Sequence, residues 1–108
     1  MTIEKNLFRA TLVTRGRTTG KIHSVTLKGV KYNNKIYFSR HKPDSDWFKN
    51  VISNSIVVIR YHDSEYSGVA KTVTDEALNK KISQLKFPGE EKADEKRVSI
   101  EITLDEQL

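Results

Sequence analysis

One segment of the chain concentrates groups that can bind an anion. It runs from Thr14 to His23 and reads Thr-Arg-Gly-Arg-Thr-Thr-Gly-Lys-Ile-His. Its two glycines let the backbone turn so that successive amide groups point at one ligand. A guanidinium fork, two hydroxyls and an ammonium group add donors, and they belong to Arg17, Thr18, Thr19 and Lys21. The segment therefore predicts a phosphate-binding loop, although the loop alone leaves open a structural or solvated basic turn.

The segment is not a Walker loop. The spacing from Gly16 to Lys21 is one residue short, no Ser or Thr follows the lysine, and a strand is predicted where a helix is needed. A loop of this kind binds phosphate without itself catalysing a reaction.

No other group of side chains indicates self-sufficient catalysis. The three histidines, His23, His41 and His62, lie on separate predicted elements without metal-ligand spacing, and the chain has no cysteine. The serines lie in no Gly-x-Ser-x-Gly elbow, and no pair of carboxylates is placed for acid–base work. We therefore expect neither a metal site nor a catalytic side chain.

The positive charge of the chain lies in its first half. The net charge is +5, but residues 1–43 carry ten Lys or Arg against one carboxylate (+9), whereas residues 44–108 carry nine against thirteen (−4). Such a field favours a phosphate-bearing partner: a nucleotide-like cofactor, a nucleic acid or an acidic membrane surface. A solvated basic face without a ligand is the alternative.

The length and hydropathy of the chain predict one domain. Residues 1–108 suffice for a single modest core. No apolar run approaches the ~20 residues of a membrane span, and the N-terminal residues do not have the pattern of a signal peptide. We therefore expect a cytoplasmic protein without a membrane span.

The apolar pattern predicts the strands that hold the loop. Strands are expected at 7–13, 25–32 and 36–38, where apolar residues recur as in half-buried strands. The parity changes near Gly29, so we expect a bulge or bend there. Asn33-Asn34 tolerates the positive φ angles of a tight hairpin.

A short helix is expected after the third strand. Asp44 or Ser45 can start it, and Ser53-Asn54 ends it. Asn50 is expected to cap or brace it. Its apolar stripe consists of two i,i+4 pairs, Trp47 with Val51 and Phe48 with Ile52.

A second helix is expected in the latter half of the chain. Thr74 can cap it, and Pro88-Gly89 stops it. Its buried face consists of Leu78, Ile82 and Leu85.

Three more strands complete the prediction. The β-branched run 56–59 indicates a central strand buried on both faces, and 66–73 follows, with a possible bend at Gly68. Residues 98–104 alternate strictly and predict a strand with one wet face. The order predicts a mainly β (α+β) fold, a six-stranded, mostly antiparallel small barrel with two short helices.

Several spaced motifs follow one another along the chain. They include Thr14 to His23, Tyr37-Phe-Ser-Arg40, Asp46-Trp-Phe-Lys-Asn-Val51 and Asn54-Ser-Ile-Val57. Together they resemble one known family, the deazaflavin-dependent nitroreductases and quinone reductases, over roughly residues 8 to 104 and in the same order. The typical pattern there is T-x-G-R-x-[ST]-G-x-x-R, then a strand ending in [ST]-[KR], then P-x-W-x-x-N-L-x-x-N-P.

The resemblance implies a split β-barrel, the fold of flavin-mononucleotide (FMN) and pyridoxine-phosphate oxidases. It implies coenzyme F420, a deazaflavin with a phosphate-linked oligoglutamate tail, as the cofactor that performs hydride transfer. It places Trp47 beside the ring or substrate pocket. It assigns to the tail phosphate Arg17, Thr18, Thr19, Gly20, Lys21 and His23, with Ser39 and Arg40 bonding to the same part of the cofactor.

The chain departs from the family pattern at several positions. Thr18 replaces a usual basic residue and His23 replaces the usual Arg, which removes fixed charge that Lys21 restores in part. Polar residues after Pro88-Gly89 stand where many members have an aromatic-rich segment. The resemblance therefore implies an open, poorly enclosed site.

Three functional hypotheses follow. The first is an F420-binding oxidoreductase that transfers a hydride from reduced deazaflavin to a quinone-like, nitro or other activated acceptor. The second is an FMN-binding or non-catalytic cofactor-binding split barrel. The third is a nucleic-acid-binding barrel surface, since Tyr32, Tyr37 and Phe38 lie in a basic stretch, but no RNA-binding aromatic motif is present. A homodimer is also possible, with Tyr61, Tyr66 or the last strand as its face.

Overall fold

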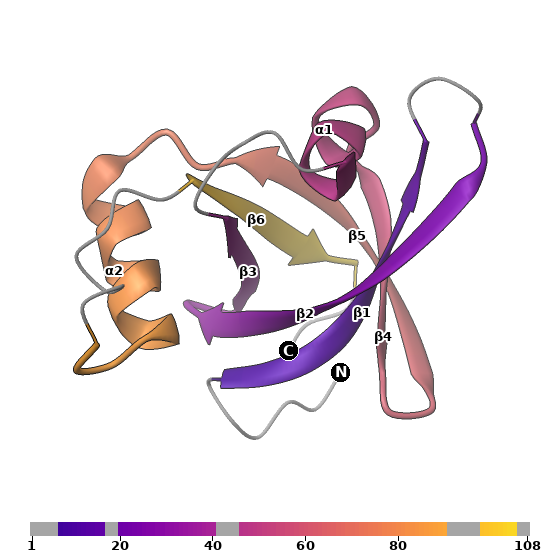
Figure 1. Ribbon diagram of the computed structural model, residues 1–108. Coiled ribbons are helices and arrows are strands. Elements are labelled where there is room, and N and C mark those ends of the chain that lie inside the picture. The colour runs from indigo at the N-terminus through magenta and orange to yellow at the C-terminus, as the bar shows by residue number, and fades with distance from the viewer. Residues whose placement is uncertain (1–6, 17–19, 41–45, 91–97, 106–108) are drawn as a thin grey trace.

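The computed structural model describes residues 7–16, 20–40, 46–90 and 98–105 (Figure 1). Six antiparallel strands form a closed barrel in the order β1-β2-β3-β6-β5-β4, and two helices pack on it. This confirms the predicted fold class. The elements are β1 (Leu7–Arg15), β2 (Ile22–Tyr32), β3 (Lys35–Arg40), α1 (Asp46–Ser53), β4 (Ile56–Tyr61), β5 (Ser64–Thr72), α2 (Glu76–Lys86) and β6 (Val98–Leu104).

Strands β1 and β2 form an arm that extends past the barrel wall. They pair from Leu7 with Val30 to Arg15 with Ile22, whereas β4 pairs with β1 only from Thr11 to Val13. The ends of the two strands therefore rise beside α1 (Figure 1). On the other side of β2, the pairs with β3 run from Val30 to Tyr32. The Asn33-Asn34 turn has the predicted positive φ angles, 51° and 62°.

The predicted bulge at Gly29 is wrong, because β2 pairs with β1 through that residue without an offset. The apolar residues of β2 change parity for another reason: both faces of this strand pack against apolar neighbours. Val25 and Leu27 pack against the barrel interior, whereas Val30 belongs to a cluster on the outer face that includes Ile82 of α2. Gly68 likewise lies within continuous pairing with β4 and β6.

The barrel interior is apolar, and α1 contributes to it. Trp47, Phe48 and Val51 are buried in this core, as predicted. Ile52 is exposed instead, and so is Ile56 on β4. The prediction that 56–59 is buried on both faces was therefore wrong, since an antiparallel barrel strand can keep one wet face.

The second helix, α2, covers the outer face of the barrel against β2, β3 and β6. Its N-cap is Asp75 rather than the predicted Thr74, and the Asp75 carboxylate accepts hydrogen bonds from the amides of Ala77 and Leu78. Ile82 is fully buried in the outer cluster, with Leu78 and Leu85 packed against that cluster, as predicted. Neither α1 nor α2, the helices that the described residues form, has the length and apolar character that a membrane crossing requires.

Strand β6 is buried on both faces over Ser99–Ile102, which contradicts the predicted wet face. Glu101 points outward from the barrel but is buried by its partners. Its carboxylate accepts hydrogen bonds from Lys35 Nζ at 2.9 Å and from the Tyr37 hydroxyl at 2.9 Å, and Lys71 Nζ lies 3.4 Å away. The charged Glu101 therefore lies in the barrel wall with an ion-pair partner on each neighbouring strand, Lys35 on β3 and Lys71 on β5.

The Glu101 network shifts two pKa values in opposite directions. Burial raises the pKa of Glu101, but the hydrogen bonds from Lys35 and Tyr37 and the two ammonium charges outweigh burial, so the pKa lies below its ordinary value. Burial, and then the hydrogen bond to Glu101, raise the pKa of Tyr37 above its ordinary value. Folding therefore favours the charged carboxylate and the neutral phenol.

The Tyr37–Glu101 pair predicts how stability depends on pH. The lowered pKa of Glu101 contributes stability that is present above its ordinary pKa of 4.5 and is lost as pH falls through the folded value. The raised pKa of Tyr37 contributes stability that is present below its ordinary pKa of 10.0 and is lost as pH rises beyond it. Urea unfolding should therefore give a free energy that falls below about pH 4.5 and above about pH 10.

Tyr37→Phe should lower the free energy of unfolding at pH 7 by about 1.5 to 3 kcal/mol, since a hydrogen bond to a charged group is lost. It should also flatten the fall above pH 10. Tyr32→Phe is the matched control, because Tyr32 lies beside Tyr37 with ring centroids 6.4 Å apart. Parallel alkaline profiles for the wild type and Tyr37→Phe would contradict the assignment.

Gly29 predicts a steric limit inside the barrel. A Cβ atom there would lie 2.9 Å from the rings of both Phe8 and Phe38. Gly29→Ala should therefore lower the free energy of unfolding by about 1 to 3 kcal/mol, the usual cost of overpacking. Ser67→Ala on β5 is the exposed control. In a double-mutant cycle, Phe8→Leu should cost less in the Gly29→Ala background than in the wild type, and strict additivity would contradict the clash.

Candidate functional site

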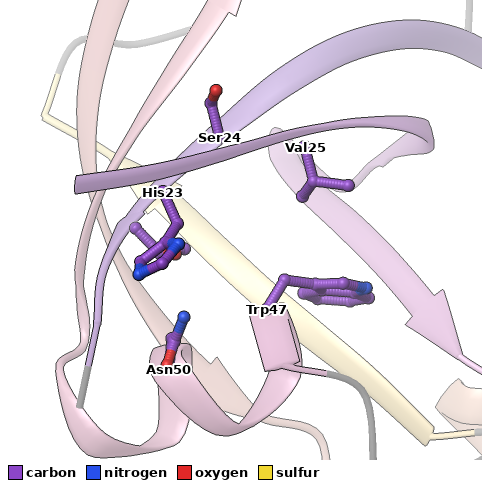
Figure 2. A pocket seen from close by; sticks show the side chains of 6 residues that line it. His23, Ser24, Val25, Trp47 and Asn50 are labelled. Carbon is purple, nitrogen blue, oxygen red and sulfur yellow. The ribbon is translucent and has the colours of Figure 1, made fainter. Parts of the chain in front are cut away.

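A pocket of about 210 Å³ lies between the β1–β2 arm and α1 (Figure 2). Its walls come from three elements: β1, β2 and α1. The residues that line it are Thr14, His23, Ser24, Val25, Trp47 and Asn50.

The β1–β2 register brings Thr14 and His23 together. They are direct cross-strand partners, two residues beyond the pair Leu12 and Val25. Because side chains alternate along a strand, Thr14 and His23 continue the inward faces of Leu12 and Val25. They therefore point under α1, at the place where the apolar interior ends.

The glycine loop leaves room for the imidazole of His23. A Cβ atom on Gly16 would lie 2.8 Å from His23 Nε2. The Gly16 amide donates to the Lys21 carbonyl at 2.7 Å, and the Gly20 amide donates to the Gly16 carbonyl at 3.0 Å. Gly20 has φ +72°, as expected of a glycine that lets the chain turn back. The two glycines thus allow the turn, and Gly16 also leaves space for the His23 ring.

Helix α1 supplies Trp47 and Asn50 from adjacent turns of one face, because they are three residues apart. Trp47 is largely a core residue, with ring centroids 6.5 Å from Phe38 and 5.6 Å from Phe48. Part of its ring forms the pocket wall beneath Val25, and the Asn50 side chain faces His23 (Figure 2).

The structure brings together two of the predicted site residues, His23 and Trp47. Ser39 lies elsewhere: its neighbour Phe38 faces the interior, so Ser39 is on the outer face, where Lys86 Nζ donates to its carbonyl at 3.1 Å. Arg40 ends β3, paired with Val98.

The other predicted residues belong to the loop at the end of the arm. Gly20 and Lys21 precede β2, and Lys21 is exposed. The predicted residues Arg17, Thr18 and Thr19 lie outside the described part of the chain.

Four of the described residues that line the pocket were not proposed individually from the sequence, namely Thr14, Ser24, Val25 and Asn50, although Thr14 begins the predicted loop segment. One signal was available for Asn50, a polar residue three positions after Trp47 on the apolar side of a short helix. Asn50 is buried, and the helix ends with the Asn54 amide donating to its carbonyl at 2.8 Å. Its backbone carbonyl thus accepts an ordinary helical hydrogen bond, while its side chain forms part of the pocket.

The pocket pairs an apolar wall with a polar edge. Val25 and Trp47 offer a surface for a flat ring, and Thr14, His23 and Asn50 offer hydrogen-bonding groups. At about 210 Å³ it is smaller than the ~300 Å³ at which pockets begin to hold drug-sized ligands, so it suits a single small ring system. Within the described ranges, no group of three or more His, Cys, Asp or Glu could hold a metal ion.

Comparison by sequence finds no relative: no family model matches the chain, and no curated protein matches it. Comparison by structure does find matches. A putative pyridoxamine 5'-phosphate oxidase from Listeria innocua aligns with TM-score 0.69 and 19% identity, covering 93% of this chain and 86% of its own.

Two further solved structures align over similar lengths. An F420-H2-dependent reductase, FDR-A, has TM-score 0.68 and 21% identity, covering 87% of this chain and 92% of its own. An FAD-binding protein from Mesorhizobium loti has TM-score 0.59 and 13% identity, covering 92% and 82%. At these identities the likeness concerns the fold, and the chain therefore has the split β-barrel fold of flavin-reductase-like proteins.

Proposed function

We propose that this protein is a deazaflavin- or flavin-dependent oxidoreductase, with F420 as the cofactor and FMN as the alternative. One observation carries the proposal: a ring-sized pocket with an aromatic wall adjoins a basic, glycine-bearing loop. His23, in the pocket, is only two residues from Lys21, in the loop. The solved structures that share the fold include a reductase named for F420 and an FAD-binding protein.

The pocket and the loop would bind different ligands. We assign the pocket to the small acceptor and the loop beside it to the cofactor phosphate, because the pocket is too small for a complete nucleotide-like cofactor. Gly20 and Lys21, with Arg17, Thr18 and Thr19 as proposed from the sequence, would supply amide, ammonium, guanidinium and hydroxyl donors. Arg40 remains part of this proposal, whereas Ser39 lies on the opposite face of the barrel wall.

A bound deazaflavin or flavin supplies hydride-transfer chemistry, so the protein needs no nucleophile of its own. The chain's own residues bind and orient. Trp47 and Val25 would hold the flat acceptor, and Thr14, His23 and Asn50 would fix its polar edge. The acceptor would be a quinone-like, nitro or other activated compound.

A nucleic-acid surface is less well supported by the side chains. Tyr37 and Phe38, two of the three aromatic residues in the basic stretch, are buried in the barrel. Base stacking requires exposed rings. The basic half of the chain therefore fits a phosphate-bearing cofactor better.

The cofactor proposal predicts a specific effect of Arg17. Binding should change the fluorescence of Trp47, the single tryptophan of the chain, as F420 or FMN is titrated. Arg17→Ala should weaken cofactor binding by about tenfold or more, because a charge-assisted phosphate contact contributes about 1.5 to 3 kcal/mol. Its melting temperature should stay unchanged.

Lys80→Ala, on the exposed side of α2, is the matched control for lost positive charge and should bind like the wild type. Competition between F420 and FMN identifies the preferred cofactor. If neither changes the Trp47 emission and neither supports turnover, the proposed function is wrong. Binding to single-stranded nucleic acid that falls steeply with salt would then favour the third hypothesis.

We further propose that the protein forms a homodimer through the outer face of β4 and β5. Ile56 and Val69 are cross-strand partners there, with 69% and 52% of their surface exposed. The faces expected from the sequence fit less well, since Tyr61 and Tyr66 pack against the interior and both edges of β6 are paired.

Ile56→Lys should shift the protein from dimer to monomer in sedimentation velocity, because a charge would be buried at the interface. Ile22→Lys, an equally apolar and exposed position on the arm, should leave the dimer intact. A wild type that sediments as a monomer at high concentration contradicts this interface.

A further inference from the structure

We propose that the protein has a second ligand site, between the β2–β3 hairpin and α2, and that this site binds a small organic dianion, either a phosphate monoester or a dicarboxylate. A cavity of about 460 Å³ lies there, called the hairpin cavity below. The residues that line it are Lys31, Tyr32, Asn33, Asn34, Lys81 and Leu85. Its volume is within the range of about 300 to 1,000 Å³ that is usual for small-molecule sites.

The hairpin cavity is remote from the pocket under α1. Strand β2 begins at the arm and ends at the hairpin, and each of its ends borders a different cavity. His23 and Tyr32 are nine residues apart on this strand, which corresponds to roughly 30 Å. In Figure 1 the end of β2 lies beside α2 and away from α1. A small ligand in the hairpin cavity would therefore not overlap the proposed cofactor and acceptor sites.

The charge that lines the hairpin cavity is positive. Among its lining residues the two charged ones are both lysines, and they come from different elements. Lys31 belongs to β2 and is half-buried, whereas Lys81 belongs to α2 and is exposed. Two ammonium groups at one cavity attract an anion, and they favour a ligand with two negative charges over one with a single charge.

The hairpin turn adds hydrogen-bonding side chains to the cavity. Asn33 and Asn34 have φ angles of 51° and 62°, the left-handed conformation of a two-residue hairpin turn. Both residues are exposed and line the cavity. Each side chain ends in an amide whose NH₂ group can donate to a phosphate or carboxylate oxygen. The turn therefore offers donors beside the two lysines.

One part of the lining is apolar and held in place by packing. Tyr32 and Leu85 line the cavity, and both pack against the outer cluster that contains Ile82. The Tyr32 ring also lies beside Tyr37, with ring centroids 6.4 Å apart. This surface can contact the hydrocarbon part of a ligand, which an inorganic ion does not have. The lining therefore fits an organic dianion better than inorganic phosphate.

The test measures the binding of phenyl phosphate and of glutarate to the wild type by isothermal titration calorimetry at low salt. At about pH 8 a phosphate monoester is a dianion, because its second pKa is about 6. The wild type should bind at least one of the two compounds, and more tightly than inorganic phosphate. The tighter of the two identifies the kind of dianion. Binding of neither compound, or equal binding of inorganic phosphate, overturns the proposal.

Two neighbouring lysines of α2 provide matched variants. Lys81→Ala should weaken binding about tenfold, because a charge-assisted hydrogen bond to the anion is lost. Lys80→Ala removes the same charge one residue away, at an exposed position that is not among the described residues lining the cavity, and should bind like the wild type. Equal losses in the two variants would indicate general attraction by the net charge and would overturn the site.

Asn34→Gly tests the contribution of the turn. Glycine adopts the left-handed conformation of this position without strain, so the hairpin should persist while one amide is removed. Affinity should fall by about two- to tenfold, the usual effect of one lost hydrogen bond. Unchanged affinity in both Asn34→Gly and Lys81→Ala would overturn the assignment of the ligand to this cavity.

Nuclear magnetic resonance then locates the bound ligand. The amide resonances of Asn33 and Asn34 should shift as the tighter-binding compound is titrated. Shifts confined to Gly20 and Lys21 would place the anion at the loop of the arm instead and would overturn the second site. These measurements need neither bound cofactor nor turnover, so their failure is distinct from failure of the proposed function.

Discussion

The constraint on which the structure depends is the side-chain alternation of the β1–β2 ladder, carried past the end of the barrel. Along β1 the same alternation that buries Phe8, Ala10 and Leu12 places Thr14 at the pocket. Its partner His23 follows Val25 in the same way on β2. A slip of one residue would expose the core and turn both site residues outward together. Core and site are therefore set by one register.

The elements that local rules govern could be predicted from the sequence. The Asn33-Asn34 hairpin, the apolar start of α1 and the buried face of α2 depend on turn chemistry and helical spacing, and the structure confirms them. What the sequence could not show is which outer face a neighbour covers. Ile56 lies on an uncovered face and is exposed, whereas Glu101 is buried because Lys35, Tyr37 and Lys71 converge on it from β3 and β5.

Of the candidate site, as of the fold, only part could be predicted from the sequence. His23 and Trp47, proposed from residue type and motif spacing, both line the pocket. No individual role was predicted for Thr14 or Asn50, since a threonine at a strand end and an asparagine in a short helix are ordinary residues until pairing and packing bring them together. Ser39, also proposed from the sequence, lies on the outer face of the barrel wall because it follows the inward-facing Phe38.

The Tyr37–Glu101 pair and the polar edge of the pocket lie on different sides of the barrel wall, and this separation has a physical reason. Tyr37 and Glu101 face outward, so Lys35 and Lys71 balance the buried charge of Glu101 on the outer side of the wall while the interior stays apolar. The polar edge of the pocket lies where that interior ends beneath α1, with His23 still open to water. A polar side chain at that rim can meet water or a ligand without placing an unpaired polar group in the core. The barrel can thus keep an apolar centre and still present polar side chains at the rim of its pocket.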